Sequence, residues 1–125
     1  MQAVIPAARA ASTSNDPSQA RSSTKVGTAG VVIKAQPGRL YILDVTNHGT
    51  TAYVLMVFDK ATAPANADAP IWRIPLPAGD KAQLDFAAFG LGCTAGISFA
   101  ISTAASPDTL TLAGAADCHW HAQYK

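Results

Sequence analysis

Short apolar runs separated by turn residues fill the chain from Val31 onward, and this pattern limits the fold more than any other feature. The runs recur at roughly ten-residue spacing, with Pro-Gly, His-Gly and Pro-Ala-Gly-Asp turns between them. They are VVIKA, RLYILDVTN, TAYVLMVFD, IWRIPL, KAQLDF, TAGISFAIST, TLTLA and HWHAQY. The eight prolines would interrupt most helices. The pattern predicts an all-β protein, namely a single antiparallel β-sandwich or a jelly-roll-like barrel of about eight strands.

Two of these runs alternate with a period of two, as half-buried strands do. In KAQLDF the apolar set is Ala82, Leu84 and Phe86, and in GISFAIS it is Ile97, Phe99 and Ile101. The intervening residues are Lys81, Gln83 and Asp85 in the first run, and Ser98, Ala100 and Ser102 in the second. We therefore expect each strand to bury one face and to expose the other.

The runs LYILDV and AYVLMVF are apolar on both faces. In the second run, Tyr53, Leu55 and Val57 would form one face, and Val54, Met56 and Phe58 the other. In a sandwich only one face of each sheet meets the core, so an isolated copy would expose Val54, Met56 and Phe58, or the opposite set. Because exposed apolar patches usually mark association, we expect these strands to mediate oligomerisation. The alternative is that the N-terminal arm or a loop of the same chain covers them.

Residues 1–26 differ in composition from the rest of the chain. The stretch AASTSNDPSQARSSTKVG contains almost no large apolar side chain, so by itself it buries too little surface to offset its ordering entropy. We expect an extended or disordered N-terminal arm over residues 1–26 and a β-sandwich domain over 27–125. The arm is either a free tail or a segment that becomes ordered against a partner.

The C-terminal GAADCHWHAQYK suggests a metal site, because two histidines flank a tryptophan. On a strand, however, His119 and His121 share one face while Trp120, Ala122 and Tyr124 share the other. Zinc needs a third and usually a fourth ligand. Cys118 points away from the histidines, and His48 lies in a distant turn. Asp117 shares their side, but we expect a strand with an aromatic core face, no metal site and no cofactor.

No catalytic motif stands out. There is neither a Gly-x-Ser-x-Gly elbow nor a phosphate-binding glycine loop, and the glycines of GLGCTAG join two strands instead of opening a helix. Cys93 has no histidine within twenty residues to act as its base. All eight acids are aspartates. Those after residue 26 lie mostly at strand ends or turns, where aspartate serves the backbone: Asp44, Asp59, Asp68, Asp80, Asp85, Asp108 and Asp117. We expect no catalytic residue and no enzyme activity.

Composition and charge argue against a nucleic-acid-binding or membrane-spanning protein. Nine basic residues are scattered against eight acidic ones, so no cluster of cations exists to neutralise nucleic-acid phosphates. No apolar run is long enough to span a bilayer. The first residues lack a basic n-region, so we expect synthesis in the cytoplasm without a signal peptide. In that compartment Cys93 and Cys118 are expected to stay reduced, although one disulfide is the alternative. Charged residues make up only 14% of the chain, which suggests that part of its surface faces protein.

From about residue 31 to 125 the chain resembles small structural proteins encoded in the virion modules of tailed bacteriophages. The resemblance is carried by PGRLY…VTN, FDKATAP, IPLPAG and TAGISFAIS. It implies a compact β-sandwich within the particle, such as a capsid cement (decoration) protein or a tail-associated component. The loop ANADAP, the two cysteines, the HWH motif and the polar arm depart from that pattern.

The resemblance implies a non-enzymatic virion protein that binds and stabilises the shell of major capsid protein. Such a cement protein would be a homo-oligomer, a trimer in preference to a dimer, and its arm would reach across joints between shell subunits. The alternative is a tail-associated module that recognises a host surface glycan through Trp72, Tyr53 or Trp120. Strand alternation turns Trp120 inward, so Trp72, beside Arg73, is the better glycan candidate.

Overall fold

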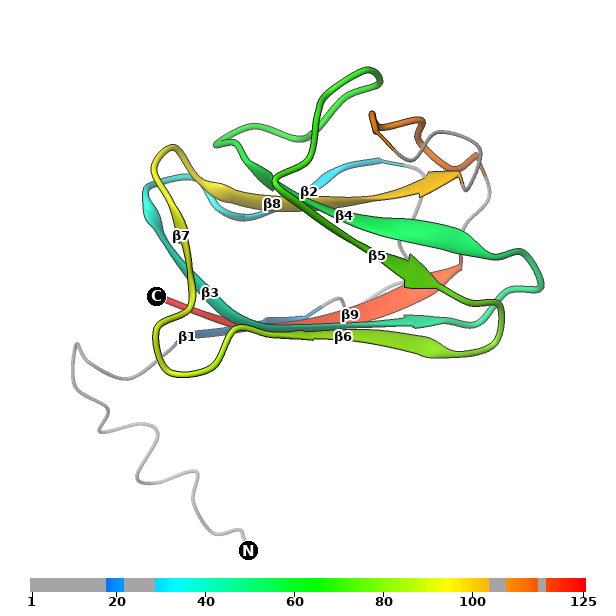
Figure 1. The fold of residues 1–125 in the computed structure, drawn as a ribbon, viewed down its shortest axis with the longest axis horizontal. Coiled ribbons are helices and arrows are strands. Elements are labelled where there is room, and N and C mark those ends of the chain that lie inside the picture. The colour runs from blue at the N-terminus through cyan, green and yellow to red at the C-terminus, as the bar shows by residue number, and fades with distance from the viewer. Residues whose placement is uncertain (1–17, 22–28, 104–107, 115–116) are drawn as a thin grey trace, which may run out of the picture.

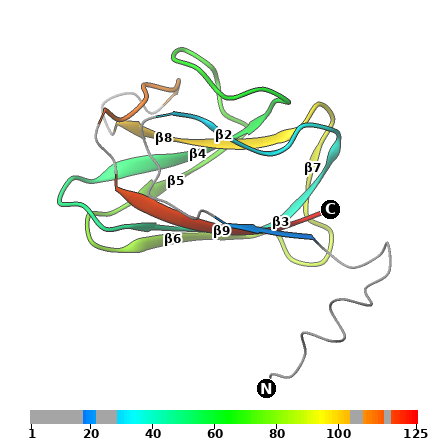
Figure 2. The same ribbon diagram turned by 180° about the vertical axis from the view of Figure 1, so that it is seen from behind.

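The computed structural model describes residues 18–21, 29–103, 108–114 and 117–125. These residues form nine strands in two antiparallel sheets, with no helix among them, and the sheets stack as a β-sandwich (Figures 1 and 2). One sheet has the order β1 (Ser18–Arg21), β9 (Cys118–Tyr124), β3 (Gly38–Asn47) and β6 (Lys81–Asp85), with β7 (Leu91–Cys93) also pairing with β3. The other sheet has the order β2 (Val31–Lys34), β8 (Ile97–Thr103), β4 (Tyr53–Asp59) and β5 (Trp72–Leu76). The predicted all-β sandwich is confirmed.

Seven of the eight predicted apolar runs contain a strand, and the exception is TLTLA at residues 109–113. That run forms one isolated bridge, between Leu112 and Ser102 of β8. Strand β2 pairs with β8 only as far as Phe99, and the TLTLA segment occupies the β8 edge beyond that point. The glycine-rich stretch GLGCTAG, which was expected only to join two strands, contains the short strand β7. This strand pairs with the first residues of β3.

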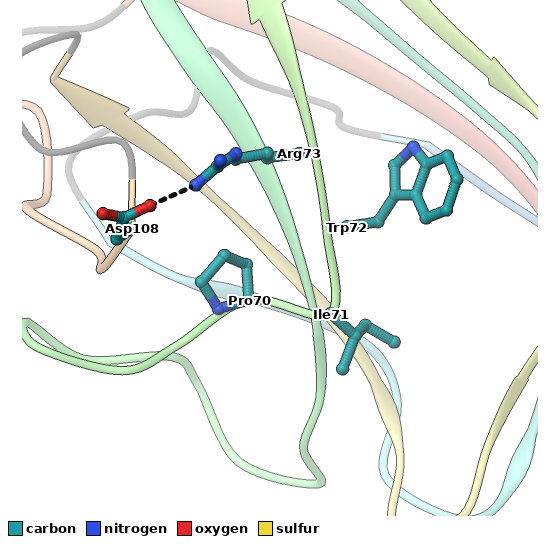
Figure 3. A pocket seen from close by; sticks show the side chains of 5 residues that line it. All are labelled: Pro70, Ile71, Trp72, Arg73 and Asp108. Atoms are coloured by element: carbon teal, nitrogen blue, oxygen red, sulfur yellow. Dashed lines mark hydrogen bonds and ion pairs between the residues drawn. The ribbon is translucent and has the colours of Figure 1, made fainter.

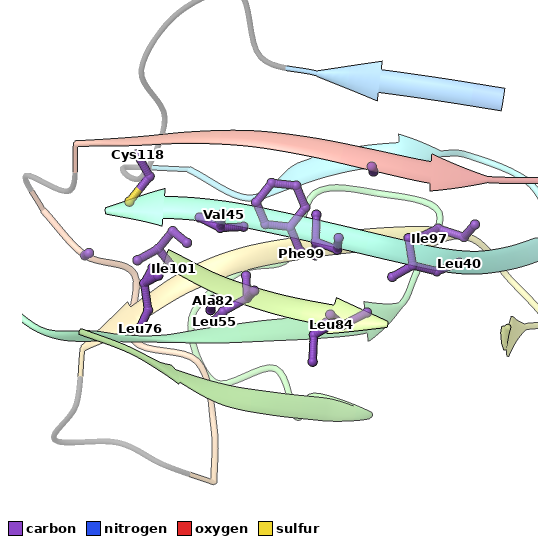
Figure 4. Close-up of a cluster of buried hydrophobic side chains, with 14 of the residues drawn as sticks. Leu40, Val45, Leu55, Leu76, Ala82, Leu84, Ile97, Phe99, Ile101 and Cys118 are labelled. Atoms are coloured by element: carbon purple, nitrogen blue, oxygen red, sulfur yellow. The ribbon is translucent and has the colours of Figure 1, made fainter. Parts of the chain in front are cut away.

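The core lies between the sheets and is built from inward-facing side chains of both (Figure 4). Phe99 of β8 is fully buried and meets Trp120 of β9 edge to face, with ring centroids 5.2 Å apart. Fully burying an aliphatic or Phe side chain contributes roughly 1.5–3 kcal/mol. Around this contact pack Leu40, Leu43, Val45, Leu55, Val57, Leu76, Ala82, Leu84, Ile97 and Ile101.

The outer face of β4 is covered within the chain. Met56 is fully buried and Phe58 is 2% exposed, because both pack with Ala100 and Leu110 in a second, smaller core. Two backbone hydrogen bonds of 2.8 Å join Leu110 to the loop after β4. The Leu110 N–H donates to the Asp68 carbonyl, and the Leu110 carbonyl accepts from the Ala67 N–H. The expectation that Met56 and Phe58 would be exposed is therefore wrong, and a loop of the same chain covers them.

The predicted alternation is confirmed for β6 and only half right for β8. Ala82 and Leu84 of β6 are buried between exposed Lys81, Gln83 and Asp85. In β8 the predicted outward set of Ser98, Ala100 and Ser102 is also fully buried. Residues 108–113 form a lid that contacts Ala100 and Ser102. The Ser98 hydroxyl donates to the Phe58 carbonyl at 3.4 Å, and the Ser102 hydroxyl accepts from the Thr111 N–H at 3.0 Å. Small polar side chains thus let the lid approach the sheet without leaving hydroxyls unpaired.

Strand β1 comes from the segment predicted to be an arm. Its four residues pair antiparallel with β9, from Ser18 opposite Tyr124 to Arg21 opposite His121, and so cover the outer edge of that sheet (Figure 2). The opposite sheet protects its edges differently: β5 contains Pro75, which cannot donate to another strand, and β2 shifts register between Val32 and Lys34. The remaining residues of the predicted arm lie outside the described part of the chain.

Candidate binding surface

A shallow depression lies at the start of β5, on the side where the edge strands of the two sheets face each other. Its volume is about 370 Å³, and Figure 3 shows the side chains that line it, which are Pro70, Ile71, Trp72, Arg73 and Asp108. Ile71 and Trp72 are 43% and 48% exposed, among the few large apolar side chains that reach solvent. The neighbouring Val54 faces a second hollow of about 230 Å³, beyond Arg73. An exposed aromatic beside a cation makes this the best candidate ligand site among the described residues.

Trp72 and Arg73 do not converge on one point. Strand alternation sends their side chains to opposite sides of β5, as Figure 3 shows. The Trp72 indole meets Phe86 edge to face, with centroids 5.5 Å apart, and so closes the gap between the two sheets. The Arg73 guanidinium donates to the Asp108 carboxylate at 2.9 Å on the other side. Both partners are well exposed, so this ion pair contributes at most about 1 kcal/mol to stability.

The other two predicted glycan-binding aromatics are partly buried. Trp120 packs on Phe99, which confirms its predicted inward orientation, and Tyr53 packs against the main core. Of the three aromatic candidates, Trp72 is the most exposed.

The three histidines lie closer together than the sequence indicated. The rings of His48 and His119 meet edge to face with centroids 4.9 Å apart, so the prediction that His48 is distant from the HWH motif is wrong. The turn after β3 folds back because the His48 N–H donates to the Asp117 carbonyl at 2.8 Å. Nevertheless, no group of three or more His, Cys, Asp or Glu side chains within the described residues has the geometry to hold a metal ion.

The cysteines cannot form a disulfide within one chain. Cys93 pairs with Gly38 and Cys118 with Asn47, at opposite ends of β3, so roughly 30 Å of strand separates them. A disulfide requires Cα atoms within about 7 Å of each other. Both thiols are buried and free, as predicted. Burial, and then the charge of Asp59, raises the pKa of Cys93 to about 11, and burial raises the pKa of Cys118, so neither forms the thiolate that a nucleophile needs.

Most of the aspartates serve turns, as predicted. Asp59, at the end of β4, accepts hydrogen bonds from the backbone N–H groups of Thr94, Ala95 and Gly96, which hold its pKa at about 2. Asp68 accepts from the Ala65 N–H and then from Lys60, which lowers its pKa. Asp44 differs, since it lies within β3 and its buried Oδ1 has no hydrogen-bond partner among the described residues.

No protein-family model, no curated protein and no solved structure matches this chain. In the described parts of the chain, no helix has the length and apolarity needed to cross a membrane.

Proposed function

We propose that the chain is a non-enzymatic structural protein of a phage virion, most specifically a cement protein that binds and stabilises a shell of major capsid protein. It would be made in the host cytoplasm and would reside in the virion. The turn and strand motifs of residues 31–125 support this proposal. Low charge and the assignment of most aspartates to turns are compatible with it, because a structural protein needs a stable scaffold and binding surface but no reactive centre.

The observation that carries the proposal is strand β1. It docks on β9 by adding a strand to the sheet edge, residue for residue, through backbone pairing. Strand addition places few demands on side chains, so a segment that pairs in this way can also pair with the sheet edge of a neighbouring subunit. Ordering each residue costs about 1–2 kcal/mol, and many such contacts across a shell would offset that cost.

We include self-association in the proposal, with a trimer favoured over a dimer. Met56 and Phe58 are covered by the lid of their own chain, so they are not free to mediate it. Ile71 and Trp72 remain exposed side by side at the start of the edge strand β5. We therefore place the contact between copies at these two side chains, outside the run AYVLMVF from which association was expected.

A second candidate function is a tail-associated module that recognises a host surface glycan. It is favoured by the half-exposed Trp72 beside the 370 Å³ depression, where Arg73 and Asp108 supply polar groups. Two observations weigh against this function: the Trp72 ring already packs against Phe86, and Arg73 lies on the other side of β5.

One experiment separates the two candidates. The purified chain is incubated either with empty shells assembled from the major capsid protein encoded alongside it, or with host envelope glycans, and each mixture is sedimented. A cement protein pellets with the shells and not with the glycans. Pelleting with glycans alone, lost in Trp72→Ala, would favour the tail-associated module instead.

A further inference from the structure

Phe89 is the most exposed of the large apolar side chains in the described residues, at 85%. It lies in the turn between β6 and β7, which projects at the lower left of Figure 1. Burying a Phe side chain is worth roughly 1.5–3 kcal/mol, and this one is left almost wholly in water. A turn of this kind does not need an aromatic residue, since its backbone requirements are met by its other residues.

The backbone of this turn is fixed by several hydrogen bonds. The Asp85 carboxylate accepts from the Ala87 N–H at 2.9 Å, and the Phe86 carbonyl accepts from the Gly90 N–H at 3.2 Å. Arg39 of β3 reaches across to donate from Nη1 to the Phe89 carbonyl at 2.9 Å. The Phe89 side chain therefore projects from a turn whose backbone is fixed by hydrogen bonds.

Two further features show that the turn adopts one specific conformation. Ala87 has a φ of +58°, a left-handed conformation that a residue with a Cβ adopts only at some cost in energy. Gly90 has a φ of +71°, and a Cβ placed there would lie 3.0 Å from the Tyr41 ring, so the ring packs directly on the turn. A turn whose backbone is fixed before binding loses little backbone conformational entropy on binding, which favours it as the site of an anchor residue at an interface.

A cation lies beside Phe89. Arg39 is exposed, and its guanidinium contacts the turn at the Phe89 carbonyl. The carboxylate of Asp85, in the same turn, already accepts a backbone hydrogen bond from Ala87. The anchor is therefore bordered by a cation whose charge is available to a partner.

We propose that Phe89 inserts into an apolar pocket bordered by carboxylates on a protein partner, with Arg39 facing those carboxylates. The proposal rests on the proposed function, and the partner surface is accordingly one on the capsid shell. A nucleic-acid or lipid partner fits less well, because the chain carries a net charge of only +1 and its cations do not form the extended stripe that phosphates need.

The test uses the full chain and empty shells in a sedimentation titration. Phe89→Ser should weaken binding by about thirtyfold, as expected for an anchor residue. Arg39→Gln, which removes the charge, should weaken it less and should reduce its dependence on salt. The matched control is Val32→Ser, which removes a 36% exposed side chain from β2, in the other sheet, and should change binding by less than about twofold. Because Phe89 is almost fully exposed, its variant should unfold at the same urea concentration as the unmodified chain.

Each alternative result is informative. If Phe89→Ser binds the shells as tightly as the unmodified chain, the anchor is wrong while the proposed function stands. If the unmodified chain does not bind the shells, both are wrong. If Phe89→Ser keeps shell binding but loses binding to duplex DNA or to anionic phosphatidylglycerol vesicles, the surface serves phosphates and the protein pocket is overturned.

Discussion

Phe99 and Trp120 join the two sheets at the centre of the sandwich, with their ring centroids 5.2 Å apart and their planes at 71°. This contact explains the HWH motif, because a strand that buries Trp120 must turn His119 and His121 to its outer face. The tryptophan is the structural member of the motif. The histidines are a consequence of the strand's alternation.

Truncating this contact should destabilise the whole domain. Phe99→Ala removes a fully buried ring from between the sheets and should lower the free energy of unfolding by about 3–5 kcal/mol. Gln83→Ala, at an exposed position of β6, is the control and should change it by less than about 0.5 kcal/mol. Urea denaturation monitored by tryptophan fluorescence measures both. Equal effects of the two substitutions would contradict the described core.

Asp59 should make stability depend on acid pH. Its pKa is about 2 in the folded chain and about 4 in an unfolded one, so its ionised form favours the folded state at neutral pH. That contribution is complete above about pH 4 and is lost as the pH falls towards 2. Asp59→Asn should therefore be less stable than the unmodified chain at neutral pH, and the difference should shrink as the pH falls through this window.

The matched control for Asp59 is Asp108→Asn, which alters an exposed ion pair and should leave stability nearly unchanged at neutral pH. Urea midpoints measured across the acid range give the comparison. Asp68, whose pKa is also lowered, adds a pH dependence of the same sign that both variants retain. A gap between Asp59→Asn and the unmodified chain that stays constant down to pH 2 would show that its carboxylate does not stabilise the turn after β7.

Leu110 should hold the lid over Met56 and Phe58. Leu110→Ala leaves a cavity in the smaller core and should cost about 2–5 kcal/mol, with increased binding of a hydrophobic dye under native conditions. It should also promote self-association, because it uncovers the apolar face of β4. Thr109→Ala, an exposed position one residue away, serves as control. Unchanged dye binding and light scattering in Leu110→Ala would mean that the lid does not shield this face.

The sequence predicted the sheet-forming runs well and the covering of the sheets poorly. Turn residues and alternation located β6 and the inner face of β8, since both depend on local backbone chemistry. Whether Ala100 and Ser102 face water or a lid depends on where residues 108–113 fold, which no local pattern encodes. The strand assigned to TLTLA failed for the same reason: its alternation suits a strand, but only one bridge on the β8 edge is formed.

At the candidate surfaces, too, local patterns in the sequence predict some features, while others depend on the three-dimensional fold. The position of Trp72 beside Arg73 favours it as a ligand-binding residue, and the structure leaves it half exposed. For Phe89 the one local signal is an aromatic residue between alanine and glycine in a turn. The approach of His48 to His119 joins residues far apart in the chain, so only the three-dimensional structure could reveal it.

Removing residues 1–26 should separate folding from binding. The described core comes from Val31 to Tyr124, so the truncated chain should still unfold cooperatively, with a small loss of stability from the uncovered edge of β9. Its binding to empty shells should be weaker, because the segment able to add strands is gone. Sedimentation and urea denaturation of the same preparation measure both effects. Binding at full strength would exclude the arm from shell attachment.

The most direct measurement is the number of copies bound per empty shell at saturation, obtained by titrating the purified chain and quantifying both proteins in the pelleted particles. A protein that cements the shell should saturate at hundreds of copies per particle, in a fixed ratio to the major capsid protein. Saturation at a few tens of copies, or no binding at all, would contradict that role.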